Sequence, residues 1–131
     1  MIKVEIYSEA GYKFDRKKIR QEIGRIVLEK GIRSDVEVCV SVVGEVKMKS
    51  LHKKYMETEE ATDVLSFPLE EGHRNKTNFV SVPDGILRLG DIVICYPVAT
   101  VQAEAGDKTV DEEMTFLAGH GCLHLLGVHH E

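Results

Sequence analysis

The chain contains 131 residues, which is the size of one ordinary domain, so we expect residues 1–131 to form a single unit. It is 43% hydrophobic and 30% charged and has three prolines, a composition that argues against disordered and fibrous classes. Its net charge of −5 argues against a protein that holds nucleic acid by bulk positive charge. We therefore expect any anionic substrate to bind at a local site.

The N-terminal half predicts strands alternating with helices. Residues 2–7 alternate apolar and polar side chains, as a half-buried strand does, and residues 36–42 repeat this alternation with four valines. Between them, an apolar stripe at helical spacing predicts a helix with Asp15 as N-cap and an end at Gly31. A second helix is expected over Glu45 to Met56.

The C-terminal half continues with two short strands and two helices. The strands are expected at residues 64–67 and 89–94, separated by a long polar loop over residues 69–88. A short helix is expected from Pro97 to Glu104, with the proline in its first turn.

The last predicted helix has the clearest boundaries. Thr109 and Glu112 have the spacing of a capping box, and Gly127 marks the C-terminal end. Because no charged residue follows Met114 in this helix, we expect it to be buried on most sides.

The chain has three cysteines, Cys39, Cys95 and Cys122, and no C-x-x-C pair. This pattern indicates neither a disulfide framework nor a thiolate zinc site, so we expect a reducing compartment. The N-terminal residues alternate in polarity, and no segment approaches the roughly 18 consecutive apolar residues of a membrane span. The expected location is the cytoplasm, without a membrane partner.

Three of the four histidines near the C-terminus have the spacing H-x3-H-x5-H. His120 and His124 are one turn apart on the predicted helix, about 40° apart in projection, so their imidazoles share a face. Gly127 permits the chain to leave the helix with positive φ and turn back, which would bring His130 to the same point. Three converging imidazoles predict a metal site.

A simpler interpretation treats these histidines as core side chains bonded to backbone groups. Three buried imidazoles would each need a partner, and unpaired polar groups cost roughly 1–3 kcal/mol apiece, whereas one shared metal ion satisfies all three. Three ligands leave a tetrahedral position open, as in catalytic zinc sites. A structural site would need a fourth ligand, and Cys39, Cys95 or an acidic side chain stays open for that role. Cys122 is excluded because it lies about 200° from His120 around the helix.

The same spacing occurs in the extended zinc-protease signature H-E-x-x-H-x-x-G-x-x-H. In that signature a glutamate follows the first histidine and acts as general base, whereas this chain has Gly121. A peptidase reaction therefore lacks its base here.

Three segments together resemble a known family. The sequence from His120 to His130 resembles the HGxLHLxGYDH signature of the YbeY family, the metal-dependent endoribonucleases of bacterial ribosomal RNA maturation. Thr62 to Pro68 resembles the second signature of that family, and Leu89 to Ile92 resembles a third. Their order and spacing also agree, so the resemblance covers nearly the whole chain.

The resemblance implies a single α+β domain with a small central mixed sheet packed with helices and a metal site on the C-terminal helix. It implies one Zn²⁺ per chain, held by His120, His124 and His130, with metal-bound water as the attacking group. It also implies hydrolysis of single-stranded RNA, maturation of the 3′ end of small-subunit ribosomal RNA, ribosome quality control and association with the small ribosomal subunit. No DNA substrate is expected.

Two positions depart from the family pattern. Tyr55 is followed by Met56, where the family usually has an arginine with a proposed role in holding substrate phosphate. His129 stands where the signature has aspartate, which removes a hydrogen-bond acceptor beside the ligand. Four cations are candidates for the missing phosphate contact: Lys53, Lys54, Arg74 and Arg88.

Three further polar residues have both a structural and a functional interpretation. Asp63 either orients a ligand or water near the metal or caps the strand that follows it. For Asp91, which follows Gly90, a role in a turn is the preferred interpretation and a role in the site is the second. Ser66 is expected to point away from the face of Leu65 and Phe67, as a cleft-lining hydroxyl without an assigned base.

The leading hypothesis is a zinc-dependent endoribonuclease, with its general acid unassigned. A ribosome-associated assembly or binding factor, which keeps the metal but cleaves little, is the alternative that Met56 favours. A third hypothesis is a metallohydrolase that acts on a small molecule or a protein. Gly121 argues against peptide cleavage, because it stands where the zinc proteases have their general base. The three imidazoles would also suit other divalent metals.

Overall fold

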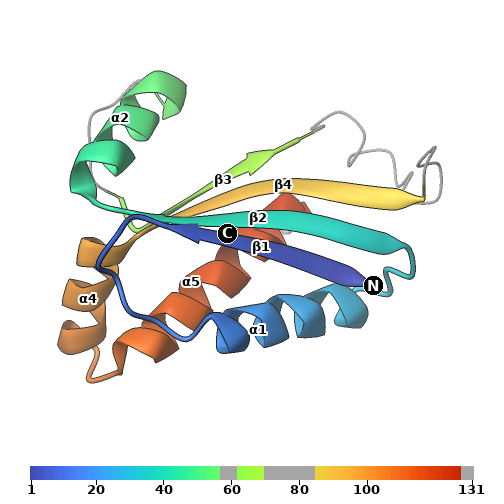
Figure 1. Ribbon diagram of the computed structural model, residues 1–131, viewed down its shortest axis with the longest axis horizontal. Helices are drawn as coiled ribbons and strands as arrows, with labels where there is room; N and C mark the ends of the chain where they lie inside the picture. Colours follow the sequence, from blue (N-terminus) through green and yellow to red (C-terminus); the bar gives the residue numbers. More distant parts are fainter. Residues whose placement is uncertain (57–61, 70–84, 128–131) are drawn as a thin grey trace.

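The computed structural model describes residues 1–56, 62–69 and 85–127, in which one sheet is packed with helices on both faces (Figure 1). The strands are β1 (Ile2–Ser8), β2 (Asp35–Val43), β3 (Val64–Pro68) and β4 (Ile86–Cys95). The helices are α1 (Arg16–Glu29), α2 (Glu45–Met56), α4 (Tyr96–Ala105) and α5 (Val110–Leu125).

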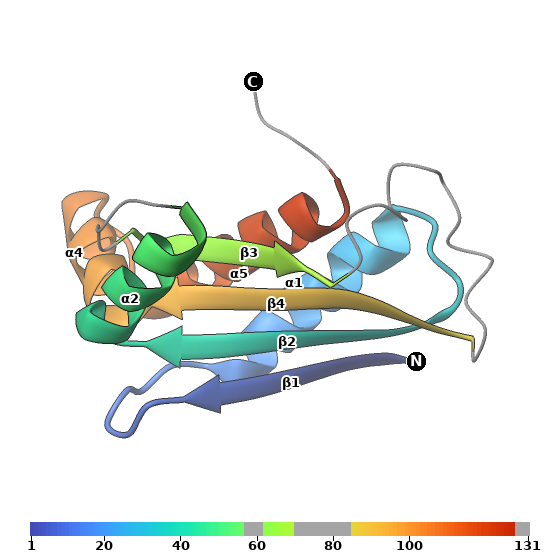
Figure 2. The same ribbon diagram turned by 90° about the horizontal axis from the view of Figure 1, so that it is seen from above.

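The strands lie side by side in the order β1-β2-β4-β3 (Figure 2). β1 and β4 both pair with β2 in parallel, whereas β3 pairs with β4 antiparallel. The sheet is therefore mixed, and the expectation of a small mixed sheet within an α+β domain is confirmed.

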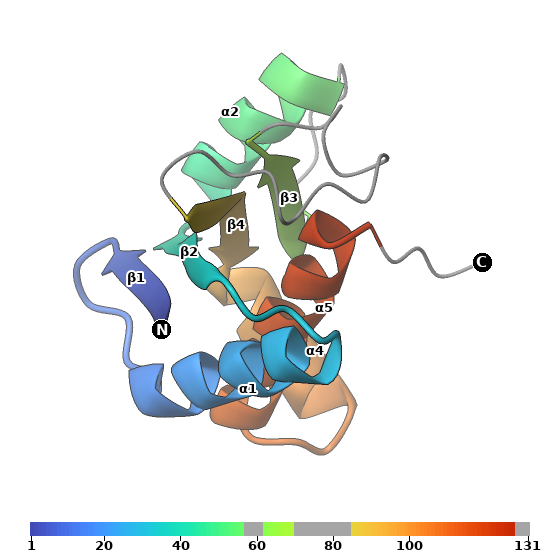
Figure 3. The ribbon, with the colours of Figure 1, turned by 90° about the vertical axis from the view of Figure 1, so that its right-hand side faces the viewer.

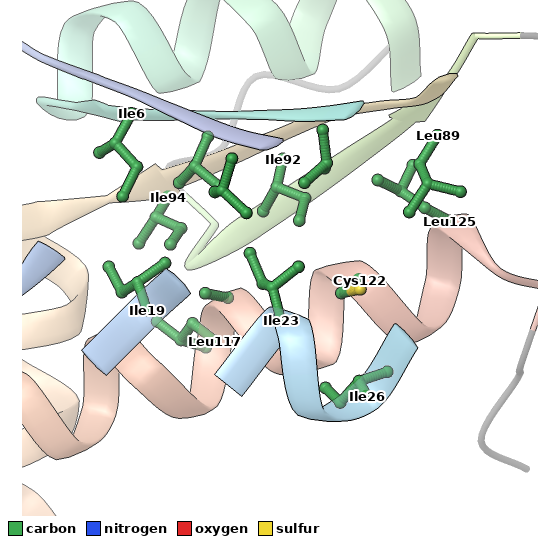
Figure 4. Close-up of a cluster of buried hydrophobic side chains, with 14 of the residues drawn as sticks. Ile6, Ile19, Ile23, Ile26, Leu89, Ile92, Ile94, Leu117, Cys122 and Leu125 are labelled. Carbon is green, nitrogen blue, oxygen red and sulfur yellow. The ribbon is translucent and has the colours of Figure 1, made fainter. Parts of the chain in front are cut away.

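α1 and α5 cover one face of the sheet and α2 lies on the other (Figure 3). The main core lies between the sheet and the α1–α5 pair, where Ile19 and Ile23 of α1 meet Ile92 of β4 and Leu117 of α5 (Figure 4). A smaller cluster under α2 contains the fully buried Met48. This packing fixes α5 against β3 and β4, with one side left toward solvent.

The helix starts follow the predicted caps. The Asp15 side chain accepts a hydrogen bond from the backbone N–H of Lys18 at 3.1 Å, and α1 begins one residue after the cap. In α5, the Thr109 hydroxyl accepts from Glu112 N–H while the Glu112 carboxylate accepts from Thr109 N–H, which completes a capping box. Pro97 lies in the first turn of α4, as expected.

One expectation is wrong in detail. β4 begins at Ile86 rather than Leu89, so the end of the predicted loop belongs to the sheet; the rest of that loop, residues 70–84, lies outside the described residues. A register shift opposite Glu37 and Val38 interrupts the alternation, which hides the start of β4 in the sequence. The expectation that α5 is buried on most sides is confirmed: among residues 114–125, Phe116 is the one exposed residue, at 57%, and the others are buried or partly buried.

Candidate metal centre

α5 places the imidazoles of His120 and His124 together. Their ring centroids are 4.4 Å apart with an interplanar angle of 50°, and both residues are partly exposed. The third predicted ligand, His130, lies outside the described residues, as does His129. The chain leaves α5 through Gly127 at φ +87°, a conformation that permits it to turn after the helix. Two nitrogen donors on one face suit a divalent ion that takes imidazole ligands.

Gly121 lies on the side of α5 that touches the sheet. A Cβ atom at this position would be 2.7 Å from Cγ2 of Ile92 and 3.2 Å from Oγ of Ser66. No side chain fits there, so a glutamate after His120 is excluded by packing. The difference from the zinc-protease signature therefore follows from how closely this helix approaches β4.

Ser66 connects β3 to α5 beside the histidine pair. Its hydroxyl donates a hydrogen bond of 3.2 Å to the carbonyl of Gly121. Leu65 and Phe67 pack in the cluster under α2, so the predicted alternation of Ser66 against its neighbours is confirmed. The hydroxyl holds α5 in place against β3. Sequence reasoning missed this role of Ser66, although a glycine such as Gly121 inside an apolar helix signals a close approach to a neighbouring element.

Asp63 is bonded to the backbone at the start of β3. Its Oδ1 accepts from Val64 N–H at 2.7 Å, and its carbonyl accepts from Cys95 N–H at 2.8 Å. These bonds match the capping interpretation, and an accessory role near the metal stays a prediction. Asp91 lies exposed within β4 rather than at a turn.

The cysteines do not gather with the histidines. Cys122 is fully buried in the main core, and burial raises the pKa of its thiol to about 12 (Figure 4). Cys95 is fully buried in the cluster under α2. The pKa of Cys39 is raised, chiefly by desolvation and to a smaller extent by the charge of Asp91. Across residues 1–56, 62–69 and 85–127, no three His, Cys, Asp or Glu side chains are grouped to hold a metal.

The sequence matches the family model described as Endoribonuclease YbeY over residues 4–131. The chain belongs to the YbeY family. Proteins named Endoribonuclease YbeY from Renibacterium salmoninarum and Leifsonia xyli are 39% and 37% identical over 98% and 97% of this chain and 80% and 81% of their own lengths.

A third YbeY protein, from Corynebacterium diphtheriae, is 34% identical over 97% of this chain, which spans 65% of that protein. The solution structure of TM1509 from Thermotoga maritima matches with a TM-score of 0.57 and 28% identity, over 98% of this chain and 75% of the other. The YbeY family consists of endoribonucleases, which hydrolyse phosphodiester bonds within RNA.

The candidate cations of this YbeY chain are dispersed. Arg88 lies between Leu87 and Leu89, which pack toward the main core, so it faces the opposite side of the sheet and forms an ion pair of 3.4 Å with Glu37. Lys53 and Lys54 are exposed in the last turn of α2, also on that side. Arg74 lies outside the described residues. Arg88, Lys53 and Lys54 therefore belong to β4 and α2, whereas the histidine pair belongs to α5.

Sequence reasoning missed Phe116, which stands one turn before His120 in this YbeY chain. Its ring centroid is 6.1 Å from that of His120, with an interplanar angle of 28°. Phe116, His120 and His124 thus follow one another along a partly exposed stripe of α5. The regular spacing of four residues is a signal that the sequence carries.

Proposed function

We propose that this chain is a zinc-dependent endoribonuclease that cleaves single-stranded ribosomal RNA. His120, His124 and His130 are the proposed ligands of one Zn²⁺. The observation that carries the proposal is the pair of imidazole rings 4.4 Å apart on α5, within the signature of an endoribonuclease family. The proposed role is maturation of the 3′ end of small-subunit ribosomal RNA and ribosome quality control in the cytoplasm.

The histidines fit the proposed ion by their chemistry and their support. A neutral imidazole offers one nitrogen to a divalent metal, and its other nitrogen is fixed by a hydrogen bond. Next to the histidine pair, α5 is anchored to the rest of the domain by the hydrogen bond from Ser66 to Gly121 and by buried side chains such as Leu125. When bound, zinc would polarise the scissile phosphate and lower the pKa of water. The helix keeps the two ligands oriented before substrate arrives.

The proposed partners are single-stranded RNA and the small ribosomal subunit. No helix in the part of the chain that the structure describes is long and apolar enough to cross a bilayer. The net charge of −5 supports local recognition of RNA rather than a broad basic surface.

A second candidate is a ribosome-associated binding factor that retains the metal but cleaves little. Met56, at the end of α2, supports it, because an apolar side chain cannot pair with phosphate. Restoring the arginine separates the two candidates. If phosphate binding limits cleavage, Met56→Arg will raise the cleavage rate strongly; if this position is irrelevant, the rate will not change.

The test is cleavage of a single-stranded RNA by the native protein and by His124→Ala. We expect the native protein to cleave, a chelator to abolish cleavage and zinc to restore it. Losing one of three ligands should reduce the rate by at least about tenfold through loss of metal affinity or activity. Metal content, measured on the same samples, should fall from one zinc per chain toward none.

An identically purified Val101→Ala variant controls for contaminating nuclease, because Val101 is an exposed residue of α4. It should retain native cleavage. Equal cleavage by the native protein and His124→Ala would contradict the proposed metal centre. Stoichiometric zinc without any cleavage would favour the binding-factor alternative.

A further inference from the structure

A pocket of about 380 Å³ lies between α1 and α5, next to the histidine pair. On the α5 side it is lined by Phe116, Gly119, His120 and Leu123. His120 is therefore shared between this pocket and the proposed metal centre. A group bound in the pocket would lie against this proposed metal ligand.

The α1 wall presents a guanidinium group held in a fixed plane. Nε and Nη2 of Arg25 donate to the two carboxylate oxygens of Glu22 at 3.0 and 2.7 Å, and Nη1 donates to Glu29 at 2.8 Å. The hydrogen bond from Arg25 lowers the pKa of Glu22, so this carboxylate stays ionised at neutral pH. Two carboxylates compensate the Arg25 charge, which makes the pocket a poor site for a phosphate.

The α5 wall presents an aromatic ring with open surface. Phe116 remains 57% exposed even though Nζ of Lys108 lies 5.0 Å from its ring centroid. Gly119 brings the two walls close together: a Cβ there would come within 3.2 Å of Ile26 Cδ1 and Glu22 Cγ, so a larger residue does not fit between them. The pocket thus combines a planar ring, a planar cation and an apolar floor.

We propose that this pocket binds one nucleobase of the RNA, adjacent to the phosphate that the histidine centre cleaves. The inference rests on the proposed function and adds a specific binding element to it. Single-stranded RNA is characteristically held by stacking bases on aromatic rings and guanidinium planes, and any base offers such a face. Because the charge of Arg25 is compensated, the pocket favours the uncharged base over the phosphate. The phosphate then stays outside the pocket, on the side of His120.

Phe116→Ala tests the pocket in metal-free protein, so that binding is measured without cleavage. The probe is a short single-stranded RNA containing 2-aminopurine, whose fluorescence is quenched when the base stacks. We expect Phe116→Ala to weaken binding by roughly five- to a hundredfold, the usual effect of removing one stacking ring. Phe116→Tyr should restore native affinity, since it keeps the ring. Val101→Ala, a similarly exposed residue on α4, should bind like the native protein.

A second measurement identifies the bound group. Adenosine and ribose 5-phosphate are added separately to the native protein, and the methyl resonances of Ile26 and Leu123 are followed by NMR. We expect adenosine to shift them and ribose 5-phosphate to leave them unchanged. Larger shifts with ribose 5-phosphate would mean that the pocket holds phosphate, and equal shifts would mean that it holds the ribose that both compounds share; either result overturns the proposal.

The outcomes separate this inference from the proposed function. If Phe116→Ala binds the RNA probe as tightly as the native protein, or neither binds it, the pocket proposal fails. Cleavage by the zinc-loaded native protein would leave the metal centre intact in that case. If Phe116→Ala binds weakly and the native protein does not cleave, the pocket stands as an RNA-binding element and the proposed catalysis fails.

Discussion

Two glycines flank His120, and each allows α5 to approach a different neighbour. Gly119 faces Glu22 and Ile26 of α1, while Gly121 faces Ile92 of β4. Glycine inside a helix costs about 1 kcal/mol relative to alanine, so these positions are unfavourable for the isolated helix. The close contacts offset that cost by letting α5 pack against α1 on one side of His120 and against the sheet on the other. The position of the histidine pair therefore depends on the absence of neighbouring side chains.

Gly121→Ala tests this dependence. The added methyl group would lie 2.7 Å from Ile92 Cγ2, so α5 must move, and we expect the free energy of unfolding to fall by roughly 1–3 kcal/mol. Gly24→Ala is the matched control: its Cβ has no heavy atom nearer than 4.0 Å, so it should stabilise α1 by up to about 1 kcal/mol. Urea denaturation at equilibrium measures both. A Gly121→Ala variant as stable as Gly24→Ala would contradict the proposed packing.

At the scale of elements, the start of α5 combines a hydrogen-bond cap with a charge. The carboxylate of Glu112 accepts from the N–H of Thr109 at 2.8 Å, which lowers the pKa of Glu112 below its ordinary value of 4.5. A carboxyl group with a lowered folded-state pKa stabilises the protein above its unfolded-state pKa. That contribution is lost as the pH falls through the lowered value.

Glu112→Gln should make this part of the stability independent of pH. The glutamine can still accept the cap hydrogen bond, but it carries no charge to interact with the helix dipole. We expect the native protein to be the more stable at pH 6, with the difference shrinking as the pH falls below about 4.5. Urea denaturation in the presence of chelator removes the effect of metal release. A difference that stays constant from pH 6 to pH 3 would contradict a charged cap.

The elements themselves are largely predictable because their signals are local. The alternation in β2, the Asp15 cap and the Thr109 capping box each depend on neighbouring residues, and the structure confirms all three. The start of β4 is missed because its pairing depends on β2, more than forty residues earlier in the chain. The His120–His124 pair is predictable as i and i+4 on one helix. The pocket is not, because α1 and α5 meet only in the folded chain.

At the scale of the whole molecule, the edge strand β1 presents backbone carbonyls that could pair with another chain. The Met1 carbonyl accepts from Val36 N–H of β2, and carbonyl directions alternate along a strand, so those of Val4 and Ile6 point to the free edge. Both are covered by side chains of α1: Arg20 donates to the Val4 carbonyl at 3.3 Å and Arg16 to the Ile6 carbonyl at 2.8 Å. We infer that these arginines protect the edge against self-association.

Replacing Arg16 and Arg20 together by alanine should therefore promote association of the whole protein. The carbonyls of Val4 and Ile6 would become available for strand pairing, and we expect the mean mass to rise with protein concentration in sedimentation or light-scattering measurements. The double variant Lys17→Ala and Lys47→Ala removes the same charge from exposed positions of α1 and α2 and should behave like the native protein. If both double variants associate equally, the effect comes from net charge rather than from the exposed edge. If neither associates more than the native protein, the arginines do not protect β1.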